Sequence, residues 1–462
     1  MHIEQLYTNC LAEAAYYIES EGESVVIDPL RETEPYLKKA EERGAKIKYV
    51  FETHFHADFV SGHLDLARKT GATIVYGPNA DTEYDVHNAK DGEEFQLGKI
   101  TLKALHTPGH TLESTCYLLK DENGKNHAIF TGDTLFIGDV GRPDLAIGNG
   151  LSQEDLAGMM FDSLRNKILP LEDEIIIYPA HGAGSSCGKN LSEDTFDTLG
   201  NQRKFNYALQ PMSREEFIQK VTEGIAPPPQ YFAKDAMINK TGYENVDKVA
   251  GQSLKGLSVK EFEQEIQHGG LLLDTREAQM FCKGFIPNSI NIGLGGMYAI
   301  WVGTLIEDIH QPILIIAEKG KEEEAVMRLA RVGYDNAVGY LEEGFEAWKE
   351  AGKPVESIHS ISAQEFAVNT SKTDSEILDV RKPNEYENAH LEKATTFPLD
   401  YIWENSHQLN KSNHYIIHCR TGYRSMIACS ILKKEGVENI TNVVGGFEAI
   451  QQTGLPVVSN IC

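Results

Sequence analysis

Residues 53–59 read THFHADF and come almost directly after the apolar run KIKYVF. Two histidines and an aspartate at alternate positions after a predicted strand are typical of a metal site. A segment that holds two metals would be expected to carry a further histidine right after Asp58. The chain carries Phe59 there, and a phenyl ring cannot coordinate a metal. The segment therefore predicts a metal site that lacks one donor.

Composition restricts the partners. The chain has 462 residues, which suits about three domains of roughly 150 residues. Its formal charge of −26 argues against nucleic acid or an anionic membrane as a partner. Seven scattered cysteines predict reduced thiols, and we see neither a secretory signal nor an apolar membrane span. We expect a cytoplasmic protein, and the sequence leaves open whether it forms a homo-oligomer.

Further ligand-type residues stand at the ends of other predicted strands. His110 follows LKALHTPG, Asp133 follows HAIFTG, and His181 follows EIIIYPA. Side chains that converge from several strand ends form a rigid set of metal ligands on an α/β scaffold. The alternative, a set of unrelated polar loop residues, does not explain why all of them share one sequence context.

The motifs THFHAD, TPGHT, TGDTLF and YPAHG resemble the metallo-β-lactamase superfamily over about residues 1–240. This resemblance implies an αββα sandwich with the metal at the loop edge between the two sheets. Two-metal members, such as the hydroxyacylglutathione hydrolases, carry histidine where this chain has Phe59. We therefore interpret the site as mononuclear, with Asp58 and His181 left as a weak pair.

The persulfide dioxygenases are the branch of this superfamily that the sequence resembles most. The resemblance implies one Fe(II) per chain, held by His54, His110 and Asp133, and leaves His56 to orient a ligand. Two histidines and a carboxylate with open positions are the pattern of non-haem iron oxygenases. A hydrolytic alternative remains, in which Zn(II) at His54, His56 and His110 carries a hydroxide that cleaves a thioester.

Two further residues of this domain have a functional and a structural interpretation. Arg142, in GDVGRPDL, could bind a substrate carboxylate, or it could pair with Asp139 or Asp144. Cys187, in HGAGSSCGKN, could line the pocket and carry sulfur, or it could be a small residue in a tight loop.

The remaining chain contains an internal repeat. LLLDTREAQMF returns as EILDVRKPNEY, with Asp274 matching Asp379, and EEGFEAWKEAGKPV returns as VGGFEAIQQTGLPV. Apolar strands that precede helices in each copy predict an α/β domain with a parallel sheet. We therefore expect two copies of one domain at residues 254–356 and 357–462, after a linker that follows the proline-rich APPPQYF.

The second copy carries the motif IIHCRTGYRS. Cys419 is predicted to begin a loop that closes on a helix N-terminus, where N–H groups and the helix dipole favour a thiolate. This motif resembles the active loop of rhodanese sulfurtransferases. The resemblance implies a persulfide on Cys419, with Arg424 and the loop amides binding anionic sulfur. The rest of the persulfide loop is Arg420, Thr421, Gly422 and Tyr423.

The first copy has AEKGKEEE in place of this loop, without cysteine, so we predict that it is catalytically inactive and acts as a spacer or docking surface. The whole chain resembles bacterial persulfide dioxygenase–rhodanese fusion proteins. This resemblance implies that dioxygen oxidises a small thiol persulfide to sulfite and thiol, and that Cys419 then transfers sulfur to give thiosulfate. The alternatives are a zinc thioester hydrolase fused to a sulfurtransferase and a non-catalytic persulfide sensor or relay.

Overall fold

The computed structural model describes residues 1–146, 150–369 and 375–459, so Cys462 lies outside the described residues. The chain divides into two compact units, Met1–Lys248 with Ala330–Gly333, and Val249–Leu329 with Tyr334–Cys462. Within the described ranges, every helix is too short or too polar to cross a lipid bilayer.

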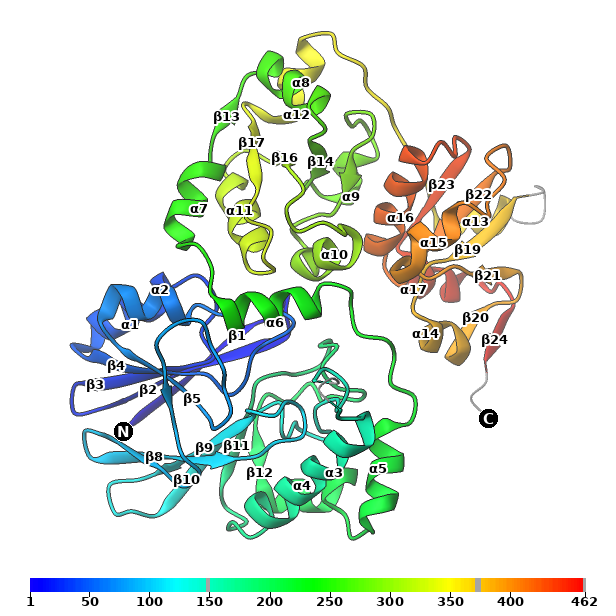
Figure 1. The fold of residues 1–462 in the computed structure, drawn as a ribbon. Coiled ribbons are helices and arrows are strands. Elements are labelled where there is room, and N and C mark those ends of the chain that lie inside the picture. Colours follow the sequence, from blue (N-terminus) through cyan, green and yellow to red (C-terminus); the bar gives the residue numbers. More distant parts are fainter. Residues whose placement is uncertain (147–149, 370–374, 460–462) are drawn as a thin grey trace. The chain divides into compact units, whose positions relative to one another are not determined.

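Two six-stranded sheets form the centre of the first unit, with strand orders β1-β2-β3-β4-β5-β6 and β12-β11-β10-β9-β8-β7 (Figure 1). The first sheet consists of β1 His2–Thr8, β2 Glu13–Ser20, β3 Glu23–Ile27, β4 Lys46–Phe51, β5 Thr73–Tyr76 and β6 His87–Asn88. The second consists of β7 Glu94–Leu97, β8 Ile100–His106, β9 Thr115–Lys120, β10 Asn126–Gly132, β11 Ile176–Pro179 and β12 Asp197–Thr198.

Apolar side chains fill three layers of core in this unit. Tyr16, Phe51 and Phe130 are among those between the two sheets, because alternate residues of a strand point to opposite faces. Helices cover both outer faces (Figure 1). They are α1 Glu34–Arg43 and α2 His63–Thr70 on the first sheet, and α3 Gln153–Ser163, α4 Leu199–Phe205 and α5 Arg214–Thr222 on the second. The predicted αββα sandwich is confirmed.

The strand directions explain where the polar residues gather. β3 and β4 are parallel neighbours in one sheet, and β10 and β11 are parallel neighbours in the other. Parallel neighbours end at the same edge, so the loops that follow them emerge together. These loops and the one after β8 carry the predicted ligands, and α6 Phe232–Thr241 and α7 Val246–Ser253 follow later in the chain.

The second unit contains two five-stranded sheets, and every strand pair within them is parallel, as predicted. The first copy consists of β13 Gly256–Leu257, α8 Val259–Gln267, β14 Leu271–Asp274, α9 Ala278–Phe281, β15 Ile290–Asn291, α10 Tyr298–Leu305, β16 Ile313–Ile316, α11 Glu322–Ala330, β17 Ala337–Leu341 and α12 Gly344–Glu350.

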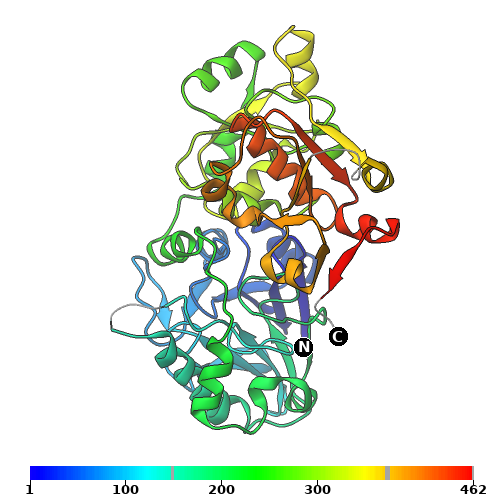
Figure 2. The same cartoon turned by 90° about the vertical axis from the view of Figure 1, so that its right-hand side faces the viewer.

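The second copy repeats this order and adds a short antiparallel pair, β20 with β24, near the C-terminal end of the described chain (Figure 2). It consists of β18 His359–Ser362, α13 Ala363–Asn369, β19 Glu376–Asp379, α14 Pro383–Asn388, β20 Ala389–Leu391, β21 Ala394–Thr396, α15 Ile402–Ser406, β22 Tyr415–His418, α16 Tyr423–Lys434, β23 Ile440–Val444, α17 Gly446–Ile450 and β24 Val457–Ser459.

The two ends of each repeat meet in the same contact. In the first copy, Arg276 Nη2 lies 2.6 Å from Asp274 Oδ2, and its guanidinium carbon lies 4.2 Å from the ring centre of Phe345. The second copy has the same ion pair at 2.6 Å and the same stacking at 3.9 Å. Its residues are Arg381, Asp379 and Phe447. The sequence repeat is therefore a structural repeat.

Candidate metal centre and sulfur-transfer loop

The structure brings the three predicted iron ligands together. Donor atoms of His54, His110 and Asp133 lie within 4.8 Å of one another, and all three side chains are buried. Asp133 Oδ2 lies 3.4 Å from His110 Nε2 and 3.9 Å from His54 Nε2. No nitrogen or oxygen donor of the described residues hydrogen-bonds either carboxylate oxygen of Asp133. Buried unpaired oxygens are costly, so this donor set fits a divalent metal ion.

Neighbouring groups fix which nitrogen of each histidine is free. His110 Nδ1 lies 2.9 Å from the main-chain oxygen of Arg142, which can only accept, so Nδ1 holds the proton and Nε2 is free. Thr53 Oγ1 donates to Asp28 at 2.9 Å and therefore accepts from His54 Nδ1, also at 2.9 Å. Burial, followed by the charges of neighbouring histidines, holds the pKa of His54 well below its usual range. The low pKa keeps the His54 ring in the neutral form that binds metals, and both rings turn Nε2 toward the carboxylate of Asp133.

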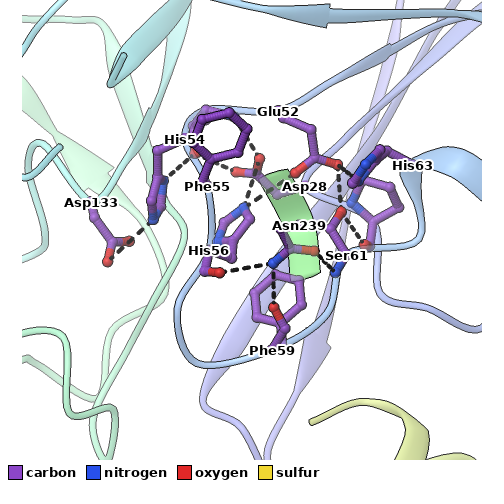
Figure 3. Close-up of polar contacts among 12 residues, drawn as sticks. Asp28, Glu52, His54, Phe55, His56, Phe59, Ser61, His63, Asp133 and Asn239 are labelled. Carbon is purple, nitrogen blue, oxygen red and sulfur yellow. Dashed lines mark hydrogen bonds and ion pairs between the residues drawn. The ribbon is translucent and has the colours of Figure 1, made fainter. Parts of the chain in front are cut away.

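The Nε2 atom of His56 points toward two other carboxylates and away from the three predicted iron ligands. That nitrogen lies 3.1 Å from Asp28 Oδ1 and 3.5 Å from Glu52 Oε2, and the ring packs 4.3 Å from the ring centre of Phe59 (Figure 3). Carboxylates beside one ring nitrogen of a histidine fix the direction in which its other ring nitrogen points. Sequence reasoning missed Asp28 and Glu52, although each follows or ends a predicted strand as the ligands do.

A second group of donors lies beside the first. His56, Asp58 and His181 are buried and have donor atoms within 4.8 Å of one another. His181 Nε2 lies 3.4 Å from Asp58 Oδ2 and 3.5 Å from Asp133 Oδ1. The description of Asp58 and His181 as a weak pair is therefore incomplete, because the structure adds His56 to them. Phe59 stands where a two-metal site would have a further histidine donor, so three donors remain in this second group.

The side chain of Arg142 is held by an ion pair and by main-chain oxygens within the protein. Its Nε and Nη2 atoms lie 2.6 and 2.7 Å from the two carboxylate oxygens of Asp144, and it also donates to the main-chain oxygens of Ser186 and Ala226. The geometry matches the structural alternative, the ion pair with Asp144, and these bonds use four of the five N–H groups of the guanidinium. The contribution of Arg142 to the site is its carbonyl, which orients His110.

Cys187 lies at the metal centre. Its sulfur is within 4.8 Å of donor atoms of Asp133 and His181, and the residue is only 1% exposed. Burial, with the charges of Asp58 and Asp133, raises the pKa of the thiol well above its usual range. This environment favours the protonated thiol, and the sulfur lies beside Asp133 and His181.

Glycine at position 141 is required by a close approach that the sequence did not reveal. A Cβ atom there would lie 2.1 Å from the main-chain oxygen of Asp133 and 3.0 Å from His110 Nδ1. We expect Gly141→Ala to separate two predicted ligands and to weaken metal binding at least as much as the loss of an outer hydrogen bond does, about 10–100-fold. Gly251→Ala, whose Cβ meets nothing within 4 Å, is the control. Wild-type metal content in purified Gly141→Ala protein would contradict this expectation.

The sulfur-transfer loop is closed around Cys419. It follows β22, its Sγ accepts a hydrogen bond from the N–H of Gly422 at 3.1 Å, and it is 1% exposed. Gly422 has a φ of 113°, in the left-handed region that favours glycine. Thr421 completes the turn, and Tyr423 begins α16, so the sulfur faces a helix N-terminus as predicted.

Both arginines of this loop have carboxylate partners. Arg424 forms two bonds to Glu385, of 2.6 and 2.8 Å, and Arg420 lies 2.6 Å from Glu448. Glu385 offsets the charge of Arg424, and the role of Arg424 in binding anionic sulfur stays a prediction. The loop amide that donates directly to the sulfur is that of Gly422.

The corresponding place in the first copy holds no thiol. A cavity of about 150 Å³ lies there, and a lysine and three glutamates are among its lining residues. The lining residues are Thr275, Glu277, Leu294, Gly295, Glu318, Lys321 and Glu324. Without a cysteine, this position cannot form a persulfide.

Comparison with known proteins matches three successive segments of the chain to two families. Residues 8–181 match the metallo-beta-lactamase superfamily, and residues 258–351 and 362–453 each match the rhodanese-like domain. A solved structure of a metallo-beta-lactamase from Staphylococcus aureus subsp. aureus COL is 32% identical, with a TM-score of 0.65, and the match covers 74% of this chain and 98% of that one.

Curated relatives fall into two enzyme classes. The human mitochondrial persulfide dioxygenase ETHE1 is 30% identical over 210 residues, which are 45% of this chain and 74% of the relative. The cytoplasmic hydroxyacylglutathione hydrolase of Arabidopsis thaliana is 34% identical over 177 residues, which are 37% of this chain and 65% of the relative. The chain belongs to the metallo-β-lactamase superfamily, with its N-terminal enzyme domain followed by two rhodanese-like domains.

Proposed function

We propose that the chain oxidises a small thiol persulfide with dioxygen at one Fe(II), held by His54, His110 and Asp133, and transfers sulfur through Cys419. The observation that carries this proposal is the buried group of two histidines, each with Nε2 turned inward, and one carboxylate whose oxygens accept from no nitrogen or oxygen donor of the described residues. Such a set leaves coordination positions open for two substrates.

The oxidation balances as one persulfide, one dioxygen and one water giving one thiol, sulfite and two protons. Fe(II), when bound, supplies the activation of dioxygen. The residues of the chain supply the environment: Thr53 and the carbonyl of Arg142 hold the two histidines with Nε2 turned inward. Phe59, which is 0% exposed, and Cys187, which is 1% exposed, add buried side chains beside the site, where charges interact more strongly than in water.

The second step uses the thiol at the start of α16. A second persulfide gives its outer sulfur to Cys419 and leaves as thiol, so that Cys419 becomes a persulfide. Sulfite then attacks the outer sulfur and leaves as thiosulfate, which returns the thiolate to Cys419. The N–H of Gly422, 3.1 Å from Sγ, stabilises the negative charge on the sulfur in this exchange.

A zinc thioester hydrolase is the second candidate. It is favoured by the additional donor group His56, Asp58 and His181 and by the similarity to a hydroxyacylglutathione hydrolase. One preparation decides between the candidates. Protein purified anaerobically without added metal is analysed for iron and zinc, then given glutathione persulfide with oxygen or a hydroxyacylglutathione thioester. We expect iron and oxygen uptake; thioester hydrolysis with two zinc ions per chain would refute the proposal.

Phe59→His is expected to restore a donor beside Asp58 and His181. The histidine would raise the occupancy of a second metal, and it would slow oxygen uptake because it crowds the open positions. Phe59→Leu, which removes the ring without adding a donor, is the matched control and should keep one metal per chain. If both variants had the same metal content, the residue at position 59 would not determine the number of metals.

A further inference from the structure

Asn239 occupies a position that sequence motifs do not reveal. It lies on α6, about 180 positions after the histidine loop in the chain, and is completely buried. Its amide nitrogen donates to the main-chain oxygens of His56 and Phe59, each at 2.8 Å, and its Oδ1 accepts from the N–H of Ser61 at 2.8 Å (Figure 3). One side chain thus binds three main-chain groups of a single turn.

These bonds hold the turn at the place where it supports a ligand. The ring of Phe59 packs 4.3 Å from that of His56, which in turn lies 4.2 Å from the ring of the predicted ligand His54. Asn239 holds the carbonyls at both ends of the His56–Phe59 turn, so it fixes the spacing of this stack. Asp58, inside the same turn, is set 3.4 Å from His181.

An irregular turn needs such support. Its buried carbonyls and N–H groups cannot join a sheet or helix, and buried main-chain groups require partners. We call the three hydrogen bonds of Asn239 the clamp. They use both N–H groups and the oxygen of its amide. Only an asparagine-like amide offers two donors and one acceptor at this distance from a helix.

We propose that Asn239 is a positioning residue of the metal centre, which holds the turn 56–61 so that the stacked rings of Phe59 and His56 keep the ligand His54 in place. The segment after the proline-rich stretch is therefore part of the metal centre. This inference rests on the proposed metal centre but not on the reaction catalysed there.

Asn239→Asp tests the clamp in the full-length chain. It keeps the shape of the side chain, removes both donors and sets a carboxylate oxygen against two carbonyl oxygens. Asn239→Ala removes the donors without adding charge. The matched control is Asn291→Asp, because Asn291 is also buried and its amide donates to two main-chain oxygens, at 3.0 and 2.9 Å, in the first rhodanese-like copy.

Metal-free proteins are titrated with Co²⁺ alone, with its visible absorption as readout. We expect both Asn239 variants to bind Co²⁺ about 10–100-fold more weakly with a shifted spectrum, while Asn291→Asp binds like wild type. Unchanged affinity and spectrum in the Asn239 variants would overturn the proposal, and so would equal weakening by Asn291→Asp. Failure of both Asn239 variants to fold, while Asn291→Asp folds, would also overturn it, because the role would then be general stability. A wild-type chain that binds Co²⁺ yet takes up no oxygen would refute only the proposed reaction.

Discussion

Replacing Cys419 with serine should abolish sulfane-sulfur transfer to cyanide or sulfite, while persulfide oxidation stays measurable. Within the described rhodanese-like copies, Cys419 is the thiol at a strand–helix turn with a loop N–H directed at its sulfur. A hydroxyl cannot form the persulfide, so the loss should be complete rather than partial. Transfer is measured as thiocyanate or thiosulfate formed per minute, and oxidation as oxygen uptake by the same sample.

Cys429→Ser is the matched control for this loss. Cys429 lies on α16, the helix that follows Cys419, is completely buried, and burial raises the pKa of its thiol far above the usual range. A thiol of this kind stays protonated and does not exchange sulfur. Residual transfer near the wild-type rate in Cys419→Ser would mean that another thiol, such as Cys187 or Cys282, is competent.

Asp133→Ala should remove the metal and with it all oxygen uptake. The carboxylate lies within 4 Å of His54 and His110, and no nitrogen or oxygen donor of the described residues hydrogen-bonds it in place of the metal. Losing a ligand should exceed the roughly 10–100-fold loss that follows from losing an outer hydrogen bond. Metal content of anaerobically purified protein measures this, and iron retained at the wild-type level would contradict the assignment.

Asp58→Ala separates the mononuclear account from a two-metal site. Asp58 belongs to the second donor group and not to the set of His54, His110 and Asp133. We expect Asp58→Ala to keep one metal per chain. Loss of one metal from two in this variant would favour the hydrolase candidate.

Local sequence patterns predicted much of the fold. Strands that end in polar motifs identified His54, His110, Asp133 and His181, because the loops of the two sheets emerge at one edge. The repeated LLLD and EILD motifs predicted two parallel-sheet domains, and the structure adds the Asp–Arg–Phe contact that joins the ends of each copy. These features depend on residues close in sequence or on a repeat.

The remaining features depend on contacts between distant segments. Asn239 meets the histidine loop from far along the chain, and nothing in the composition of α6 marks it. The sequence left open whether Arg142 binds a substrate or a neighbouring carboxylate. In the structure it pairs with Asp144, two residues on, and with the main-chain oxygen of Ala226. Glu385 lies in the repeated segment EILDVRKPNEY, but only the fold shows that it pairs with Arg424.

The ratio of dioxygen consumed to persulfide consumed tests the coupled activity most directly. In wild type, sulfite from one persulfide receives the sulfur of a second on Cys419, so one dioxygen should be used for every two persulfides, with thiosulfate as product. Cys419→Ser should use one dioxygen per persulfide and release sulfite. Equal ratios and equal sulfite-to-thiosulfate yields in the two proteins would contradict the account, because the two sites would then work independently.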